Sequence, residues 1–155
     1  MTRIIRVTHN NPAPAAVKYA AALAAVHSVL GLAYAVLLLY RQFTGADDPS
    51  LVSEKPGQTS WVGLGTAVFF IIVFGAVLAA AVVLLRSTHP GRWPRGPIVI
   101  LELILLPIAV AMIKGGAWPA GIATGISAAA SLALMFSKPA LDWATATYDV
   151  AEDAD

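Results

Sequence analysis

Two ionisable side chains, Glu102 and His27, lie inside otherwise apolar stretches of the sequence. A charged group at membrane depth is costly, so each must be neutral, paired or close enough to the surface to reach water. A histidine and a carboxylate that meet near the membrane centre can pass a proton between them, as in transporters, or bind a ligand. Simpler roles remain open. Glu102 can reach toward Arg92 or Arg95, bond a neighbouring helix or pair with a partner subunit.

The depth of the two groups decides whether they can meet. His27 follows Val17, the expected start of the first apolar helix, by ten residues, or roughly 15 Å at about 1.5 Å per residue. Glu102 lies roughly 9 Å inside the third apolar helix if that helix starts near Pro97. The offset of about 6 Å lets the two side chains touch wherever these helices pack together. A lone histidine on an alanine-rich helix is also typical of a hydrogen-bonded packing residue.

Other reactive groups are few. The chain has no cysteine, which excludes disulfides, thiolate metal sites, iron–sulfur clusters and covalent haem attachment. Haem b needs two axial ligands, and His9 and His89 fall outside the apolar stretches. The adjacent pair Asp47 and Asp48 is typical of a solvated turn. We therefore expect no catalytic residues, no metal, no cofactor and no nucleic-acid partner.

Four apolar stretches must position these groups. The clearest, residues 61–85, contains no charged side chain and is long enough for a helix to cross a bilayer core of about 30 Å. The whole chain is 58% hydrophobic and only 12% charged, against about 25% charged in soluble domains. The sequence predicts an all-α protein with four transmembrane helices, at about 17–40, 61–85, 97–113 and 117–136.

The basic residues predict the orientation. With four spans, seven of the ten Lys and Arg residues fall on the side of the two termini, namely Arg3, Arg6, Lys18, Arg86, Arg92, Arg95 and Lys138. By the positive-inside rule both termini are then cytoplasmic, in the inner (plasma) membrane. We expect a cytoplasmic arm at 1–16, a transmembrane domain at 17–136 and an acidic, solvated cytoplasmic tail at 137–155. A cleaved signal peptide is the alternative for the first stretch, but its apolar run of residues 19–40 is too long for one.

Two further features concern packing and lipid. Gly121, Gly125 and Ala129 recur every four residues, a spacing that lets two helices approach closely. Pro107 lies inside the third span, where a proline frees a carbonyl and bends the helix. The basic segment of residues 86–95 could also hold anionic lipid headgroups, although membrane orientation alone explains its charge. Its candidate residues are Arg86, Arg92 and Arg95.

Residues 93–136, with Arg95-Gly96-Pro97, the Leu-Leu-Pro sequence ending at Pro107 and the turn Gly116-Ala117-Trp118, resemble the third and fourth spans of small four-helix membrane proteins of actinobacteria. Glutamine commonly stands at the position of Glu102 in that family, which implies that an amide suffices there. The family brings no assigned activity. Accessory subunits of the actinobacterial cytochrome bcc–aa3 supercomplex are similar to the chain in size and span count.

We therefore expect a non-catalytic accessory or stabilising subunit of a larger membrane complex, with a respiratory supercomplex as the specific hypothesis and phospholipid as a further partner. The alternative is a small homo-oligomeric transporter or channel that uses Glu102 and His27. Small multidrug exporters resemble the chain in span count, but their essential carboxylate lies in the first span, where this chain has none.

Overall fold

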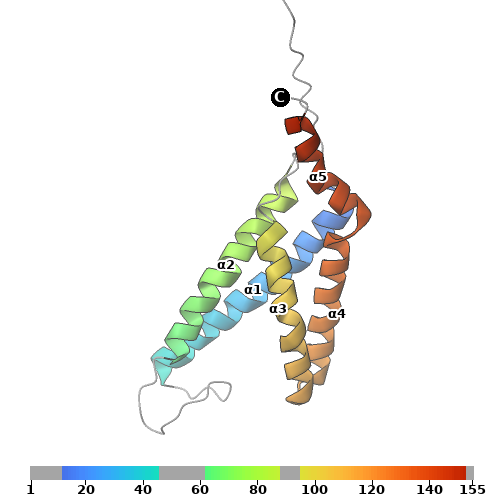
Figure 1. Ribbon diagram of the computed structural model, residues 1–155. Helices are drawn as coiled ribbons and strands as arrows, with labels where there is room; N and C mark the ends of the chain where they lie inside the picture. Colours follow the sequence, from blue (N-terminus) through green and yellow to red (C-terminus); the bar gives the residue numbers. More distant parts are fainter. Residues whose placement is uncertain (1–11, 46–61, 88–94, 153–155) are drawn as a thin grey trace, which may run out of the picture.

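The computed structural model describes residues 12–45, 62–87 and 95–152, and helices are the secondary structure within them (Figure 1). The helices are α1 (Ala15–Thr44), α2 (Val62–Arg86), α3 (Arg95–Lys114), α4 (Trp118–Met135) and α5 (Lys138–Glu152). The first four are long and apolar enough to cross a membrane. The predicted all-α fold and its four long apolar helices are therefore confirmed.

The helix ends agree with the predicted ranges to within two residues, except in α1, which continues to Thr44. It ends there because Gly45 adopts a left-handed conformation, with φ of 69°, and donates its backbone N–H to the carbonyl of Arg41. A second glycine with positive φ, Gly116 at 90°, makes the short turn between α3 and α4. Glycine takes this conformation without the steric cost of a Cβ atom.

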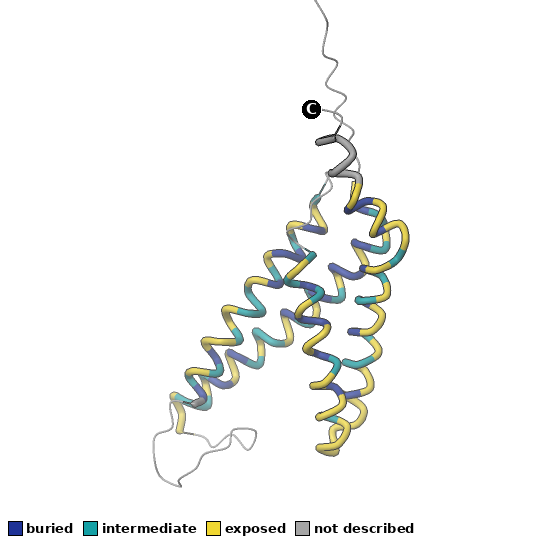
Figure 2. Tube along the Cα trace, viewed as in Figure 1, coloured by how far each residue is buried: buried dark blue, intermediate teal, exposed yellow. Residues whose placement is uncertain are grey.

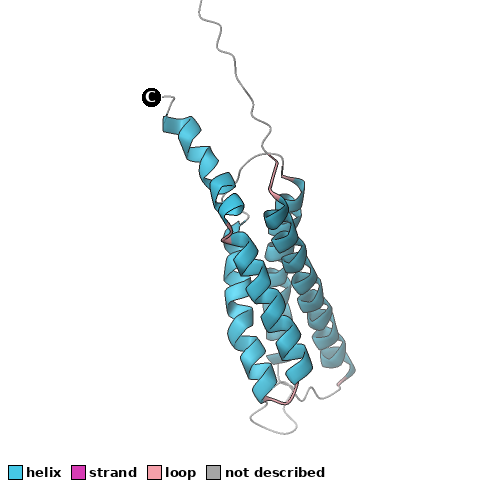
Figure 3. Cartoon of the chain, turned by 90° about the vertical axis from the view of Figure 1, so that its right-hand side faces the viewer, coloured by secondary structure: helices cyan, strands magenta, loops and turns pink. Residues whose placement is uncertain are grey.

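The four long helices form two antiparallel hairpins, α1 with α2 and α3 with α4 (Figure 1). The hairpins meet at the end of the bundle where α5 lies and diverge toward the other end, so that they outline a V. Seen after a turn of 90°, the long helices run in nearly the same direction (Figure 3). The divergence therefore lies mainly in the plane of Figure 1.

One buried cluster joins the hairpins, and it occupies the half of the bundle next to α5. It contains Ala13, Val17, Ala20, Ala21, Ala24, Val77, Ala80, Ala81, Leu84, Ile98, Leu101, Leu105, Ala128, Met135, Ala140 and Trp143. Leu38 and Ala67 in the first hairpin and Ala109 in the second are also buried, but they lie outside this cluster. The far end of the second hairpin is largely exposed (Figure 2). Among the described residues, the far halves of the hairpins thus share no buried cluster.

The segment after α4 differs from the prediction of a solvated tail. It forms α5, in which Ala140, Trp143 and Ala144 are buried. Their spacing of three and four residues places them on one helix face. Pro139 suits the first turn of a helix, where a backbone N–H has no helical partner. The apolar face outweighs the acidic composition, and residues 138–144 belong to the folded bundle.

Glycine sets the distance between helices in each hairpin. A Cβ atom on Gly31 of α1 would overlap the ring of Phe74 on α2. A Cβ atom on Gly121 would lie 2.7 Å from the carbonyl oxygen of Ala109, and one on Gly125 would lie 3.4 Å from the Cβ of Ala109. Gly121 and Gly125 therefore pack against α3.

The third small residue of the predicted ridge does not share this contact. Ala129 is exposed on the described chain, and Ala128 takes the buried position in that turn. The reason is that a helix turns once in about 3.6 residues, so a repeat of four drifts away from a fixed contact face. Pro107 is also exposed, and α3 continues through it.

Candidate functional site

Three polar side chains from three helices meet inside the bundle: His27 of α1, Glu102 of α3 and Ser127 of α4. Nδ1 of His27 lies 3.2 Å from Oε1 and 3.1 Å from Oε2 of Glu102. Nε2 of the same ring lies 2.9 Å from Oγ of Ser127. The imidazole thus bridges α3 and α4 from its place on α1, and we call these three residues the polar triad.

Small residues allow the helices to come this close. Ala20 and Ala24 of α1, two turns and one turn before His27, are fully buried. Ser131, one turn after Ser127 on α4, places its Oγ 3.4 Å from the carbonyl oxygen of Ala20. Larger side chains at these positions would separate α1 from α4 and break the contact between His27 and Ser127. The small residues of α1 therefore contribute directly to the polar triad.

The position of Glu102 follows from the apolar face of α3. Ile98, Leu101 and Leu105 are buried in the cluster that joins the hairpins. Glu102 shares their side of the helix, and its exposed fraction is 0%. The side chain of His27 is 10% exposed. Both groups are thus largely removed from solvent, and Glu102 depends on His27 for its polar partner.

The hydrogen bonds around His27 limit where its protons lie. Oγ of Ser127 is 2.8 Å from the carbonyl oxygen of Ala123 and 3.1 Å from that of Thr124, so its single hydroxyl proton points into its own helix. Nε2 of His27 must then donate to Oγ of Ser127. A hydrogen bond between Nδ1 and the carboxyl group of Glu102 then requires one proton on one of these two groups.

That shared proton has two possible places. Either an imidazolium donates to a carboxylate, or a protonated carboxyl group donates to a neutral imidazole. The pair carries no net charge in both arrangements, which suits an apolar environment. Oε2 of Glu102 is buried and accepts no hydrogen bond from the described part of the chain, although it lies near Nδ1. The chemistry that this geometry allows is transfer of a proton between Nδ1 and Glu102.

The sequence pointed to His27 and Glu102 but not to Ser127. Of the roles left open for Glu102, the structure shows the bond to a neighbouring helix. Within the described residues, Glu102 pairs with His27, and the guanidinium of Arg95 instead donates from Nη2 to the carbonyl oxygen of Met135. Ser127 is one of two serines in the alanine-rich α4, and its sequence position alone does not show which helix it faces.

The remaining predicted residues lie at the end of the bundle near α5. Arg86 is the exposed last residue of α2, and Arg95 is the half-buried first residue of α3. Arg92 lies outside the described residues. Within the described ranges, no group of three His, Asp or Glu residues is arranged to hold a metal ion.

Comparison with known protein families, with curated proteins and with solved structures finds no significant match to this chain. The resemblance of residues 93–136 to small actinobacterial membrane proteins therefore stays a prediction.

Proposed function

We propose that this chain is a non-catalytic accessory subunit of a larger membrane complex, and that a helix of its partner packs into the opening between the two hairpins. The observation that carries the proposal is the restriction of the shared core to one half of the bundle. In the other half the two hairpins diverge (Figure 1), and exposed apolar side chains remain there for another helix to cover.

The opening begins directly beyond the polar triad. Leu30 follows His27 by one turn of α1 and therefore lies on nearly the same face. His27 has a 10% exposed side chain, whereas Leu30 is 63% exposed. The face that packs against α3 and α4 at His27 is thus uncovered one turn later. The polar triad ties α1, α3 and α4 together at this point and supports the angle between the hairpins.

We also propose how the chain is oriented and which membrane contains it. The distribution of Lys and Arg supports cytoplasmic termini in the plasma membrane, which puts the open end of the V in the outer leaflet. An actinobacterial respiratory supercomplex is the specific partner that we propose, on the basis of size, span count and the resemblance of residues 93–136. Polar segments at both membrane faces would add contacts to such an assembly.

Site-specific crosslinking tests the proposal. A photoreactive phenylalanine analogue replaces Leu30 in one strain and Ile72 in another, and the complexes are extracted in a mild detergent. Ile72 is 65% exposed and lies on the face of α2 opposite its buried residues, so it serves as the matched control. We expect Leu30 to crosslink to a supercomplex subunit in good yield and Ile72 to crosslink weakly. A protein that migrates alone, with no crosslink from Leu30, would refute the proposal.

A second function is favoured by the contact between His27 and Glu102. A buried pair that shares one proton between helices could couple proton movement to transport in a small homo-oligomer. Proteoliposomes loaded with a pH-sensitive dye test this, with a potassium diffusion potential as the driving force and ethidium as a transport probe. Transport by this pair predicts flux that Glu102→Gln and His27→Ala both abolish. Flux that neither variant changes, or no flux at all, would exclude this function for the pair.

A further inference from the structure

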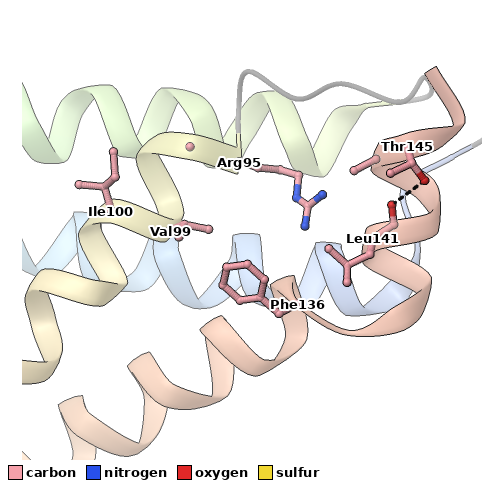
Figure 4. A pocket seen from close by; sticks show the side chains of 8 residues that line it. Arg95, Val99, Ile100, Phe136, Leu141 and Thr145 are labelled. Carbon is pink, nitrogen blue, oxygen red and sulfur yellow. Dashed lines mark hydrogen bonds between the residues drawn. The ribbon is translucent and has the colours of Figure 1, made fainter. Parts of the chain in front are cut away.

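A pocket of about 460 Å³ lies between the start of α3, the end of α4 and the first turns of α5 (Figure 4). Val99 and Ile100 of α3, Phe136 after α4 and Leu141 of α5 form apolar walls. Arg95 lies at the same pocket, and Figure 4 shows its guanidinium between α3 and α5. The pocket thus combines one cation with a mainly apolar surface.

Arg95 has more donors than the described residues use. A guanidinium carries five N–H groups, and among the described residues its acceptor is the carbonyl oxygen of Met135. Its Nε is buried and has no hydrogen-bond partner within the described ranges. The other polar side chain at the pocket, Thr145, already donates to carbonyl oxygens of its own helix. Arg95 would therefore bind an anionic group more tightly than a neutral one, because hydrogen bonds between charged groups are stronger than neutral hydrogen bonds.

The size and position of the pocket indicate the rest of the ligand. Its volume falls in the range of about 300–1,000 Å³ that is typical of sites for small organic molecules, and it exceeds what a phosphate ion fills. Arg95 is the first residue of an apolar helix, so it lies at headgroup level if α3 crosses a membrane. Lys18 and Lys138 lie at the same end of the bundle and add positive charge there. The nearby acidic residue of α5, Asp142, has an exposed side chain.

We propose that this pocket binds an anionic phospholipid. The phosphodiester accepts hydrogen bonds from Arg95, and the upper part of an acyl chain lies against Val99, Ile100 and Phe136. A free phosphate ion offers the same anionic oxygens, but it leaves the apolar walls uncovered. The inference does not depend on the partner complex proposed above.

Native mass spectrometry of the full chain in a mild detergent tests this site. The protein is titrated with phosphatidylglycerol or with phosphatidylcholine of the same acyl chains. We expect tighter binding of phosphatidylglycerol, and about tenfold weaker binding in Arg95→Gln, because a bond to a charged group is lost. Lys114→Gln removes an exposed cation at the opposite end of α3, outside the pocket, and is the matched control, with a loss of less than about twofold. Equal losses of phosphatidylglycerol affinity in the two variants would show that surface charge alone explains the effect, which would overturn the proposal.

A second variant keeps Arg95 and fills the pocket. Leu141 is 42% exposed, so Leu141→Trp can project into the pocket without disturbing the core. We expect it to weaken binding of phosphatidylglycerol as much as Arg95→Gln does, with unchanged helicity by circular dichroism. If Arg95→Gln fails to fold because it loses the contact with Met135, Leu141→Trp still tests the lipid site. Intact binding in Leu141→Trp, or displacement of the lipid by excess inorganic phosphate, would contradict a lipid site.

Discussion

At the scale of single residues, the polar triad explains how this chain holds a fully buried carboxyl group. Glu102 is fully buried, and the hydrogen bond to His27 supplies the polar partner that a buried carboxyl group needs. Ser127 fixes the orientation of the imidazole by accepting from Nε2, which turns Nδ1 toward Glu102. An amide could replace the carboxyl group in this arrangement, because it can donate to Nδ1 of a neutral imidazole.

Replacement of Glu102 distinguishes a structural from a proton-carrying role. We expect Glu102→Gln to lower the free energy of unfolding by less than about 1 kcal/mol, because the amide keeps the volume and one hydrogen bond. Glu102→Ala leaves Nδ1 of His27 without a partner and opens a cavity, at a cost of about 2–4 kcal/mol. Denaturant titration of the protein in detergent micelles, followed by circular dichroism, measures both. Equal losses for the two variants would show that the amide cannot replace the carboxyl group.

Only part of the polar triad could be predicted from the sequence. The depths of His27 and Glu102 followed from the rise per residue of a helix, which hardly varies. Ser127 could not be found in this way, because depth says nothing about how a helix is rotated about its axis. The rotation of α4 depends on contacts between distant residues, such as Gly121 with Ala109, and those are visible only in the folded chain.

At the scale of elements, length and hydropathy predicted the four long helices well, whereas they missed α5. A transmembrane helix is defined by a long apolar run, and no alternative structure satisfies its backbone in a membrane. A short amphipathic helix such as α5 depends on a few apolar contacts, here those of Ala140, Trp143 and Ala144. Because this segment is acidic, its composition predicted a solvated tail and did not reveal its apolar helix face.

The contact between α3 and α4 predicts a difference between two glycines. Gly121→Ala places a methyl group 2.7 Å from the carbonyl oxygen of Ala109, a backbone atom that cannot move away alone. We expect this variant to lose about 1–3 kcal/mol of stability as the helices separate. Gly65→Ala on α2 meets nothing within 4 Å and is the control, expected to be neutral or slightly stabilising. Denaturant unfolding in detergent micelles measures the stability of both variants. Equal stability of the two variants would contradict close packing at Gly121.

At the scale of the whole molecule, the two halves of the V differ in how well the hairpins cover each other. The half of the bundle next to α5 is closed by its shared core and by the polar triad. The other half lacks such a shared core among the described residues, and we propose that a partner helix packs there. The pocket beside Arg95 lies at the closed end, so lipid binding there and a partner in the opening would use opposite ends of the molecule.

Which end faces the cytoplasm can be measured directly, because the chain has no cysteine of its own. Ala117, before α4, and Thr145, on α5, are both exposed and lie at opposite ends of the bundle. If the positive-inside rule holds, a membrane-impermeant maleimide added to intact cells labels Ala117→Cys and reaches Thr145→Cys only after permeabilisation. The reverse pattern would invert the orientation and put the open end of the V in the cytoplasmic leaflet. Labelling of both residues in intact cells would contradict the threading of four helices through the membrane.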